Sequence, residues 1–320
     1  MDLDFSSYET SNSSWLELNL SARLGSMNLE LSYDLLQKLI AVFMQRKALC
    51  GFELHMGRVM HSFRTGATEP PVLSLLTVML LLACHFAKDP KLKALEPIFL
   101  ESTRLDIEAN VARAHSFILS SMYTANPSLA TNRAMSLLGQ WFYFQSRMLE
   151  AQFHIAQAMR FAIAMGFHRL NSRILDHYTI PRDAPQVSGV EPWKPRDSTE
   201  LGEAINASCT IRDLAGAMLM GLPPSLSLDE VTTVWPLLLS AFEESQELVP
   251  DDNYSIVALF DPVLSYEAAN ASQGGISCLM AKVCIIIYTA SQLNIERLSG
   301  EILKSRMIGL HDSKAVTVQQ

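Results

Sequence analysis

Residues 129–170 constrain the fold more than any other part of the sequence, because they contain two apolar helical patterns separated by a short break. Apolar side chains recur every three or four residues in both patterns, at Met135, Leu138, Trp141 and Phe142 and then at Ile155, Met159, Ala162 and Ile163. This spacing places the apolar residues of each segment on one face of an α-helix. The second segment is rich in alanine, which lets two helices approach closely. We expect an antiparallel pair of packed helices that ends at Gly166.

The same helical spacing continues along most of the chain. Further helices are expected at about residues 32–43, 52–63, 71–87, 200–220 and 276–293, and one or two more within residues 97–123. No run of alternating polar and apolar residues leads into a hairpin turn, so no β-sheet is predicted. Apolar residues make up 49% of the sequence, which is enough to fill a sizeable core. The predicted fold class is all-α, as a multi-helix bundle built of packed antiparallel helix pairs.

Composition divides the chain into three parts. Residues 1–28 are rich in serine and asparagine and lack sustained helical spacing, so they are predicted to be a disordered lead-in. Residues 29–300 are predicted to form the domain, and residues 301–320 a frayed tail. Within the domain, residues 171–200 contain four prolines and few aliphatic side chains. They predict a proline-rich loop, within which the segment 180–196 is either regulated or a tolerated insertion.

The uncharged stretch Pro71–Ala87 raises the question of a membrane span. It falls short of the ~20 residues that cross a bilayer. It also contains His85, and the charged residues Lys88 and Asp89 follow it directly. A core helix is therefore favoured, and no membrane contact is predicted.

The charge and the cysteines limit what the chain can bind by itself. The formal net charge is −8 and no long basic run occurs, which argues against direct binding to nucleic acid. The five cysteines are scattered and form no C-x-x-C pair, so neither a zinc ribbon nor a redox dithiol is predicted. We expect reduced, buried thiols and no metal or other cofactor in this chain.

Sequence signatures of common enzyme classes are missing. The chain has no G-x-x-x-x-G-K-[ST] phosphate loop, no G-x-S-x-G elbow and no H-E-x-x-H zinc motif. Asp251 and Asp252 resemble paired metal-binding acids, but Asn253, Tyr254 and Ser255 follow them in place of further carboxylates. These two acids are interpreted as a solvated turn. The chain is predicted not to be an enzyme and to have no catalytic residues.

Residues Gln145–Leu170 resemble the helix–turn–helix hallmark of the fungal-specific transcription factor domain. That hallmark has a short turn, an acidic residue followed by alanine or glycine, an alanine-rich helix and a closing Gly-Leu-His-Arg. The matching residues are Glu150, Ala151, Gly166, His168 and Arg169. The resemblance gives these residues structural roles, with no catalytic or metal-binding role implied.

A second stretch, Gly202–Pro236, is similar to a later motif of the same family. In that motif an aspartate precedes a Gly-x-Pro, and an acidic stretch that ends in proline follows. The matching residues are Asp213, Gly221, Pro223 and Pro236, with Asp213 eight residues before Gly221. Leu279–Leu293 resembles a third, late helix. The three motifs stand in the expected order, and the resemblance spans about residues 30–297.

One departure from the second motif concerns Asp213. The family usually has an arginine directly after this aspartate, but Leu214 follows it here. If that arginine pairs with the acid, Asp213 has lost its partner, and an unpaired buried carboxylate is costly. We therefore expect Asp213 to be either a costly buried acid or an exposed one.

The resemblance implies a regulatory domain of a zinc-cluster-type transcription factor, which controls transcription by RNA polymerase II in the nucleus. In this family the zinc belongs to a separate N-terminal cluster that this sequence does not contain, so contact with DNA is expected only through an upstream module. A protein partner, a homodimer and a small-molecule effector are all open. The alternative is a truncated, stand-alone helical interaction protein without DNA-binding activity.

Overall fold

The computed structural model describes residues 32–52, 54–62, 72–117, 127–178, 193–207, 210–243, 255–260, 278–294 and 297. The α-helices are α2 (Tyr33–Arg46), α3 (Met56–Ser62), α4 (Leu73–Phe86), α5 (Pro90–Lys93), α6 (Glu96–Phe117), α7 (Pro127–Phe144), α8 (Met148–Met165), α9 (Ser198–Ala207), α10 (Thr210–Met220) and α11 (Leu239–Glu243), followed by a helix over residues 278–294. Short 3-10 turns are η2 (Lys47–Cys50), η3 (Phe167–Arg169), η4 (Leu175–His177), η5 (Leu228–Glu230) and η6 (Val257–Leu259). Apart from an isolated bridge between Val234 and Ser255, the regular structure of the described residues is helical, which confirms the all-α prediction.

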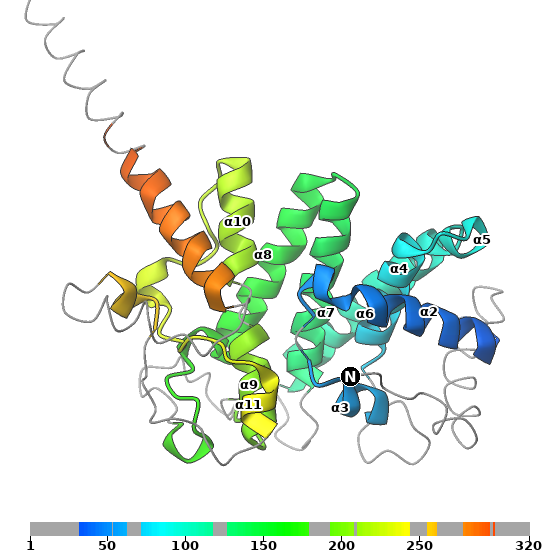
Figure 1. Cartoon of the computed structure of the whole chain (residues 1–320), viewed down its shortest axis with the longest axis horizontal. Helices are drawn as coiled ribbons and strands as arrows, with labels where there is room; N and C mark the ends of the chain where they lie inside the picture. The colour runs from blue at the N-terminus through cyan, green and yellow to red at the C-terminus, as the bar shows by residue number, and fades with distance from the viewer. Residues whose placement is uncertain are drawn as a thin grey trace, which may run out of the picture.

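The helices form two groups around a central pair (Figure 1). α7 and α8 lie in the middle of the molecule and pack along each other. On one side, α4 packs against α2, α6 and α7. On the other side, α10 packs against α8, and α9 packs against α7 and α11. The central pair therefore joins the N-terminal helices to the C-terminal ones.

The central pair is the antiparallel helix pair predicted at residues 129–170. A turn from Gln145 to Arg147 joins the two helices, and Ser146 in this turn has a φ of 58°. The backbones approach closely at Gly139, where a Cβ atom would overlap the side chain of Ile155. The apolar positions predicted to face the core are buried at Met135, Leu138, Trp141, Phe142, Ile155, Met159 and Ala162.

α4 is apolar and buried on every side. All of its residues from Ser74 to Cys84 are buried among the neighbouring helices α2, α6 and α7. The Thr77 hydroxyl donates a hydrogen bond to Leu73 O at 3.0 Å, which satisfies it inside the helix. Within the stretch predicted from Pro71 to Ala87, α4 is thus a core helix. No helix in the described ranges is long and apolar enough to cross a membrane.

Several helix ends agree with the sequence signals that predicted them. α8 ends at Gly166, which has a φ of 81°, and α10 ends at Gly221, which has a φ of 64°. Both values lie in the left-handed region that glycine adopts without strain, and this conformation ends a helix. At the start of α2, the Ser32 side chain accepts a hydrogen bond from the Leu35 N–H at 3.4 Å.

The helix expected at residues 52–63 is shorter than predicted. α3 begins at Met56, because His55 caps it by accepting a hydrogen bond from the Arg58 N–H on its ring Nδ1 at 3.0 Å. Gly51 precedes this cap in the left-handed conformation, with a φ of 55°, and separates α3 from the turn η2.

The proline-rich loop expected at residues 171–200 contains the turn η4, and the helix expected from residue 200 begins two residues early. α9 begins at Ser198, because Asp197 caps it by accepting the Glu200 N–H at 2.9 Å. Residues 179–192 of this loop lie outside the described residues. The predicted lead-in, the predicted tail and the acids Asp251 and Asp252 also lie outside them.

The helix over residues 278–294 is buried on one face. Cys278, Ala281 and Ile285 point into the core, and the Lys282 ammonium lies 5.5 Å from the centre of the Trp235 ring. The opposite face is exposed although it is apolar, at Leu279, Met280, Val283, Ile286, Ile287 and Leu293.

Candidate functional site

The two motif segments contact each other through main-chain hydrogen bonds. Thr232 and Thr233 both donate their N–H groups to His168 O, at 2.9 and 3.1 Å. The Val234 N–H donates to Leu170 O at 2.9 Å. The chain that follows α8 is therefore held beside the chain that leads to Trp235 and Pro236. The hallmark's closing Gly-Phe-His-Arg and the end of the second motif form one unit.

His168 contributes its carbonyl to this unit, while its ring is buried. Burial and, to a smaller extent, the positive charge of Arg169 lower the pKa of His168 to about 4. The ring is therefore neutral near pH 7. Its Nδ1 atom is buried and has no hydrogen-bond partner in the part of the chain that the structure describes. The ring fills the core, and the motif acts through its backbone.

Asp213 lies on α10 and is 1% exposed. Its carboxylate oxygens accept three hydrogen bonds. Ser225 donates its N–H to Oδ2 at 2.6 Å and its hydroxyl to Oδ1 at 2.8 Å. Gln152, on α8, donates from Nε2 to Oδ1 at 3.3 Å. Asp213 therefore links α10 to α8 and to the turn that follows α10.

This geometry corrects the expectation that Asp213 is either unpaired or exposed. The acid is buried, and neutral donors take the place of the arginine that the motif usually supplies. Its neighbour Arg212 instead donates to Cys50 O and Gly51 O, each at 2.9 Å. Burial raises the pKa of Asp213 above its ordinary value, and the hydrogen bonds offset part of that increase.

Tyr143 extends the network toward α7. Its hydroxyl donates to Gln152 Oε1 at 3.0 Å, so that Gln152 bridges Tyr143 and Asp213. A Cβ atom at Gly216 would overlap both the Gln152 side-chain oxygen and the Tyr143 hydroxyl. Gly216 therefore leaves the space in which these side chains meet. Burial and the charge of Asp213 together raise the pKa of Tyr143.

Buried charged side chains also tie the N-terminal region to α9. Arg133, which is 1% exposed, donates to Gly51 O and Asn206 O, each at 3.4 Å. Glu203 accepts the His55 N–H at 2.7 Å. Burial raises the pKa of Glu203 to about 7, although this hydrogen bond acts in the opposite direction.

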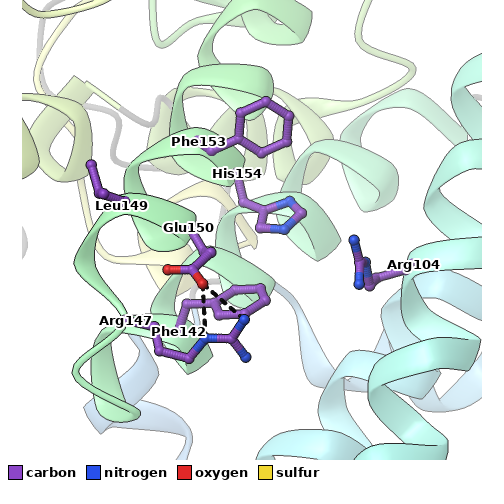
Figure 2. A pocket seen from close by; sticks show the side chains of 7 residues that line it. All are labelled: Arg104, Phe142, Arg147, Leu149, Glu150, Phe153 and His154. Atoms are coloured by element: carbon purple, nitrogen blue, oxygen red, sulfur yellow. Dashed lines mark hydrogen bonds and ion pairs between the residues drawn. The ribbon is translucent and has the colours of Figure 1, made fainter.

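A pocket of about 250 Å³ opens where α6, α7 and α8 meet, near the start of α8. It is lined by Arg104, Phe142, Arg147, Leu149, Glu150, Phe153 and His154 (Figure 2). Figure 2 shows Arg104 extending from α6 across the pocket from His154. The Phe142 ring supports the pocket from inside: the Arg147 guanidinium lies 4.7 Å from its centre, and the His154 ring stacks on it at 5.0 Å.

Among the charged side chains that the structure describes in the pocket, Arg147 and Glu150 form an ion pair and Arg104 does not. Arg147 donates from Nε and Nη2 to Glu150 Oε1, at 3.0 and 2.8 Å, and these bonds lower the pKa of Glu150. Burial and then the charge of Arg104 lower the pKa of His154 to about 4, so this ring is neutral near pH 7. Arg104 itself forms no hydrogen bond or ion pair with any described residue.

The predicted motif residues fall into different surroundings. Glu150 lines the pocket, and Ala151 is buried in the contact between α8 and α7. His168 and Asp213 take part in the contact between the motifs. The others lie at helix ends and in the loops that follow them, namely Gly166, Arg169, Gly221, Pro223 and Pro236.

Three residues that the sequence reasoning missed complete these sites. Gln152 carries a signal that could have found it, because it is a polar residue on the buried face of a helix rich in alanine. Ser225 follows two prolines, and Arg104 lies within a long mixed helix. Neither has a spacing or a neighbour that distinguishes it from other surface residues.

The described residues offer no donor set for zinc or another metal. No group of three or more His, Cys, Asp or Glu side chains among them is arranged to hold a metal ion. Cys50, Cys84 and Cys284 are free thiols. The described ranges therefore do not fit a zinc cluster.

Comparisons with known proteins identify a family. A search of curated proteins and a search of solved structures each returned no significant match. A family model described as the fungal-specific transcription factor domain matches residues 54–308, a range that contains both motif segments and the helix over residues 278–294. Proteins of this family are in general not enzymes. Because the match covers most of the 320 residues, this chain belongs to the family of fungal-specific transcription factor domains.

Proposed function

We propose that this chain is the regulatory domain of a zinc-cluster-type transcription factor and controls transcription by RNA polymerase II. The proposal places it in the nucleus, without enzymatic activity and without a cofactor of its own. The family match supports this role. The observation that carries it is the contact between the two family motifs, in which His168 O and the Asp213 carboxylate hold separate segments together.

α8 is the element through which such a domain transmits a signal. Toward α10 it presents Gln152 to the buried Asp213. Two residues earlier it presents Glu150 to the pocket. Residues two apart point about 200° apart on a helix, so these side chains lie on opposite faces of α8. A displacement of α8 at the pocket therefore reaches the motif contact through one rigid element.

A reporter assay tests the proposed function. The full chain is fused to an unrelated sequence-specific DNA-binding domain and expressed in a fungal strain that carries the matching reporter. We expect the fusion to change reporter transcription at least several-fold relative to the DNA-binding domain alone. A folded, nuclear fusion that leaves the reporter unchanged in several growth media contradicts the proposal. The Ala162→Asp variant, which disrupts the core, is the control for a requirement for the folded domain.

Contact with DNA is assigned to a separate module. Nucleic acid binding takes much of its affinity from lysine and arginine against phosphate. The chain has a formal net charge of −8. An electrophoretic mobility shift assay with the purified chain should show no sequence-specific complex on fungal promoter fragments. A specific complex would place DNA recognition in this domain.

A second candidate function is a stand-alone interaction protein, and the exposed face of the helix over residues 278–294 favours it. Leu279, Val283, Ile286 and Leu293 follow one another at alternating spacings of three or four residues, with the exposed Ala290 between the last two. This is the spacing of a coiled-coil seam. The partner that fits it best is a helix with the same seam, which a second copy of this chain supplies.

Sedimentation of the purified chain tests this second candidate. We expect a concentration-dependent dimer that the Ile286→Lys substitution converts to a monomer. Asn294→Lys adds the same charge to an exposed polar position of the same helix and should leave the dimer intact. A monomer at all concentrations contradicts this role for the helix.

A further inference from the structure

The pocket at the start of α8 contains one positive charge in excess. Arg104 and Arg147 are the cations that line it, and Glu150 is the anion. Arg147 is held by Glu150 through two hydrogen bonds, so its charge is compensated. His154 is neutral near pH 7, because its pKa is about 4. The uncompensated charge is that of Arg104, which makes no hydrogen bond or ion pair with the described residues.

This local charge contrasts with the chain as a whole, whose formal net charge is −8. A guanidinium carries five N–H donors in a plane and binds a carboxylate with two parallel hydrogen bonds. At Arg104 these donors face a pocket and are not used within the described structure. The pocket can therefore bind one small anionic group through Arg104.

The rest of the pocket wall is aromatic and aliphatic. Phe153 is 59% exposed and Leu149 is 68% exposed, although both are large apolar side chains. The Phe153 and His154 rings meet edge to face, with centroids 5.4 Å apart. Such a wall favours contact with a flat apolar body, because aromatic rings pack in offset or edge-to-face pairs.

The size of the pocket limits what it can hold. Its volume is about 250 Å³. A single substituted ring fits this space.

We propose that the pocket between α6, α7 and α8 binds a small, flat monoanion of the aromatic carboxylate class. The carboxylate lies on Arg104, and the ring lies against Phe153 and Leu149. Glu150 sets the charge that the pocket accepts, because it compensates Arg147 and leaves room for one negative charge. This inference specifies an effector for the proposed regulatory function, but the binding itself does not depend on that function.

Binding to the purified full chain is the direct test, with 4-fluorobenzoate as the probe. We expect saturable broadening or shift of its 19F signal, with a Kd in the millimolar range or tighter, and competition by benzoate. Benzamide has the same shape without the charge and should compete at least tenfold more weakly. Equal competition by benzoate and benzamide would overturn the assignment of an anion site.

Two variants change the pocket charge in opposite directions. Arg104→Gln should weaken 4-fluorobenzoate binding at least tenfold, and Glu150→Gln should strengthen it, because the first removes the excess charge and the second adds one. Arg160→Gln removes an exposed arginine of α8 outside the pocket and is the matched control. All these positions are at least partly exposed, so the variants should fold. Binding that is the same in all three variants overturns the proposal.

A protein partner is the competing occupant, since Leu149 and Phe153 are exposed. The protein partner would be the ligand if 4-fluorobenzoate did not bind, but an acidic amphipathic peptide bound the chain and was not displaced by benzoate. This result would overturn the assignment of a small anion. The binding assay does not involve transcription. If 4-fluorobenzoate does not bind, the proposed regulatory function is therefore unaffected. If the reporter fusion is inactive, the binding of a small anion is unaffected.

Discussion

Glu150 and Asp213 are the two carboxylates that the family motifs identify, and they lie in opposite environments on the two sides of α8. Glu150 is at the surface of the pocket and accepts two hydrogen bonds from one arginine. Asp213 is buried against α8 and accepts three hydrogen bonds from neutral donors. The pKa of Glu150 is lowered and that of Asp213 is raised.

Burial outweighs the number of hydrogen-bond donors in setting the pKa values of these two carboxylates. Asp213 has more hydrogen bonds than Glu150, yet the loss of water shifts its pKa in the direction that disfavours the charged form. A carboxylate in such a place stabilises the fold only while its donors remain, because removing one partner leaves the other buried and unsatisfied. The exposed Glu150 keeps water as an alternative partner. We therefore expect the two acids to respond differently to substitution.

The largest effect should come from a carboxylate placed in the core with no donors at all. Ala162 is 1% exposed in the contact between α7 and α8. Ala162→Asp should destabilise the domain by about 4 kcal/mol or more. Ala164→Asp places the same group on the exposed face of α8 and should cost at most about 1 kcal/mol. Equal melting temperatures for both variants would contradict the orientation of α8.

The next largest effect is expected at Glu203, where the free energy of unfolding should depend on pH. The folded protein keeps a proton on Glu203 up to about pH 7, whereas the unfolded chain releases it near 4.5, so a rise in pH between these values favours unfolding. The free energy of unfolding should fall by about 3 kcal/mol over this pH range. Glu203→Gln should remove this loss and be more stable than the original chain at pH 8.

Urea unfolding of the original chain and of Glu203→Gln between pH 4.5 and pH 8 measures this difference in the free energy of unfolding. His154 and His168 act in the opposite direction, because their lowered pKa values cost stability as the pH falls from 6.5 toward 4. Subtracting the two curves removes their contribution. Glu108→Gln, at an exposed position on α6, is the matched control. Parallel curves for the original chain and Glu203→Gln would show that Glu203 has no raised pKa.

Substitutions at Asp213 should have intermediate effects that depend on the replacement. Asp213→Ala leaves the Ser225 N–H and the Gln152 amide without an acceptor and should cost about 2 kcal/mol. Asp213→Asn should cost less than about 1 kcal/mol, because the Gln152 amide and the hydroxyls around it can reverse their donor and acceptor roles.

The midpoint of urea unfolding separates these two Asp213 variants. Asp229→Asn changes an exposed acid in the turn η5 and serves as the control. If Asp213→Asn is as destabilised as Asp213→Ala, the negative charge itself is required, and the proposed reversal of hydrogen bonds is wrong.

The smallest effect is expected at Glu150. Its ion pair with Arg147 joins two half-exposed side chains that are three residues apart at the start of α8. Surface pairs of this kind contribute little to stability, because water and salt screen them. Glu150→Ala should leave the melting temperature unchanged at 150 mM salt. A clear drop in the melting temperature would mean that the motif glutamate supports the fold at the start of α8.

Local signals predicted much of the fold. The spacing of apolar residues identified the pair α7 and α8. Gly166 and Gly221 mark the ends of α8 and α10, because each adopts a left-handed conformation. The predicted starts of helices were less accurate than the predicted ends. The start of α3 depends on the His55 ring, which replaces the usual Ser, Thr, Asp or Asn cap, and composition does not reveal such a cap.

The partners in the candidate sites could not be predicted, because they come from distant parts of the chain. Asp213 was identified from its motif, but the absence of the following arginine gave no indication that Ser225 and Gln152 replace it. Arg104 reaches the pocket from α6, and its role depends on how α6 packs beside α7 and α8. No spacing along the sequence encodes that packing.

The hydrogen bond from Arg212 to Gly51 O also has a consequence for the synthesis of the protein, because it joins residues 161 positions apart. At 5–20 residues per second, the ribosome adds Arg212 roughly 10 to 30 s after it adds Gly51. During this time the carbonyl groups of Cys50 and Gly51 lack the guanidinium that later binds them. The contact between the N-terminal region and α10 can therefore form only after α10 has been synthesised.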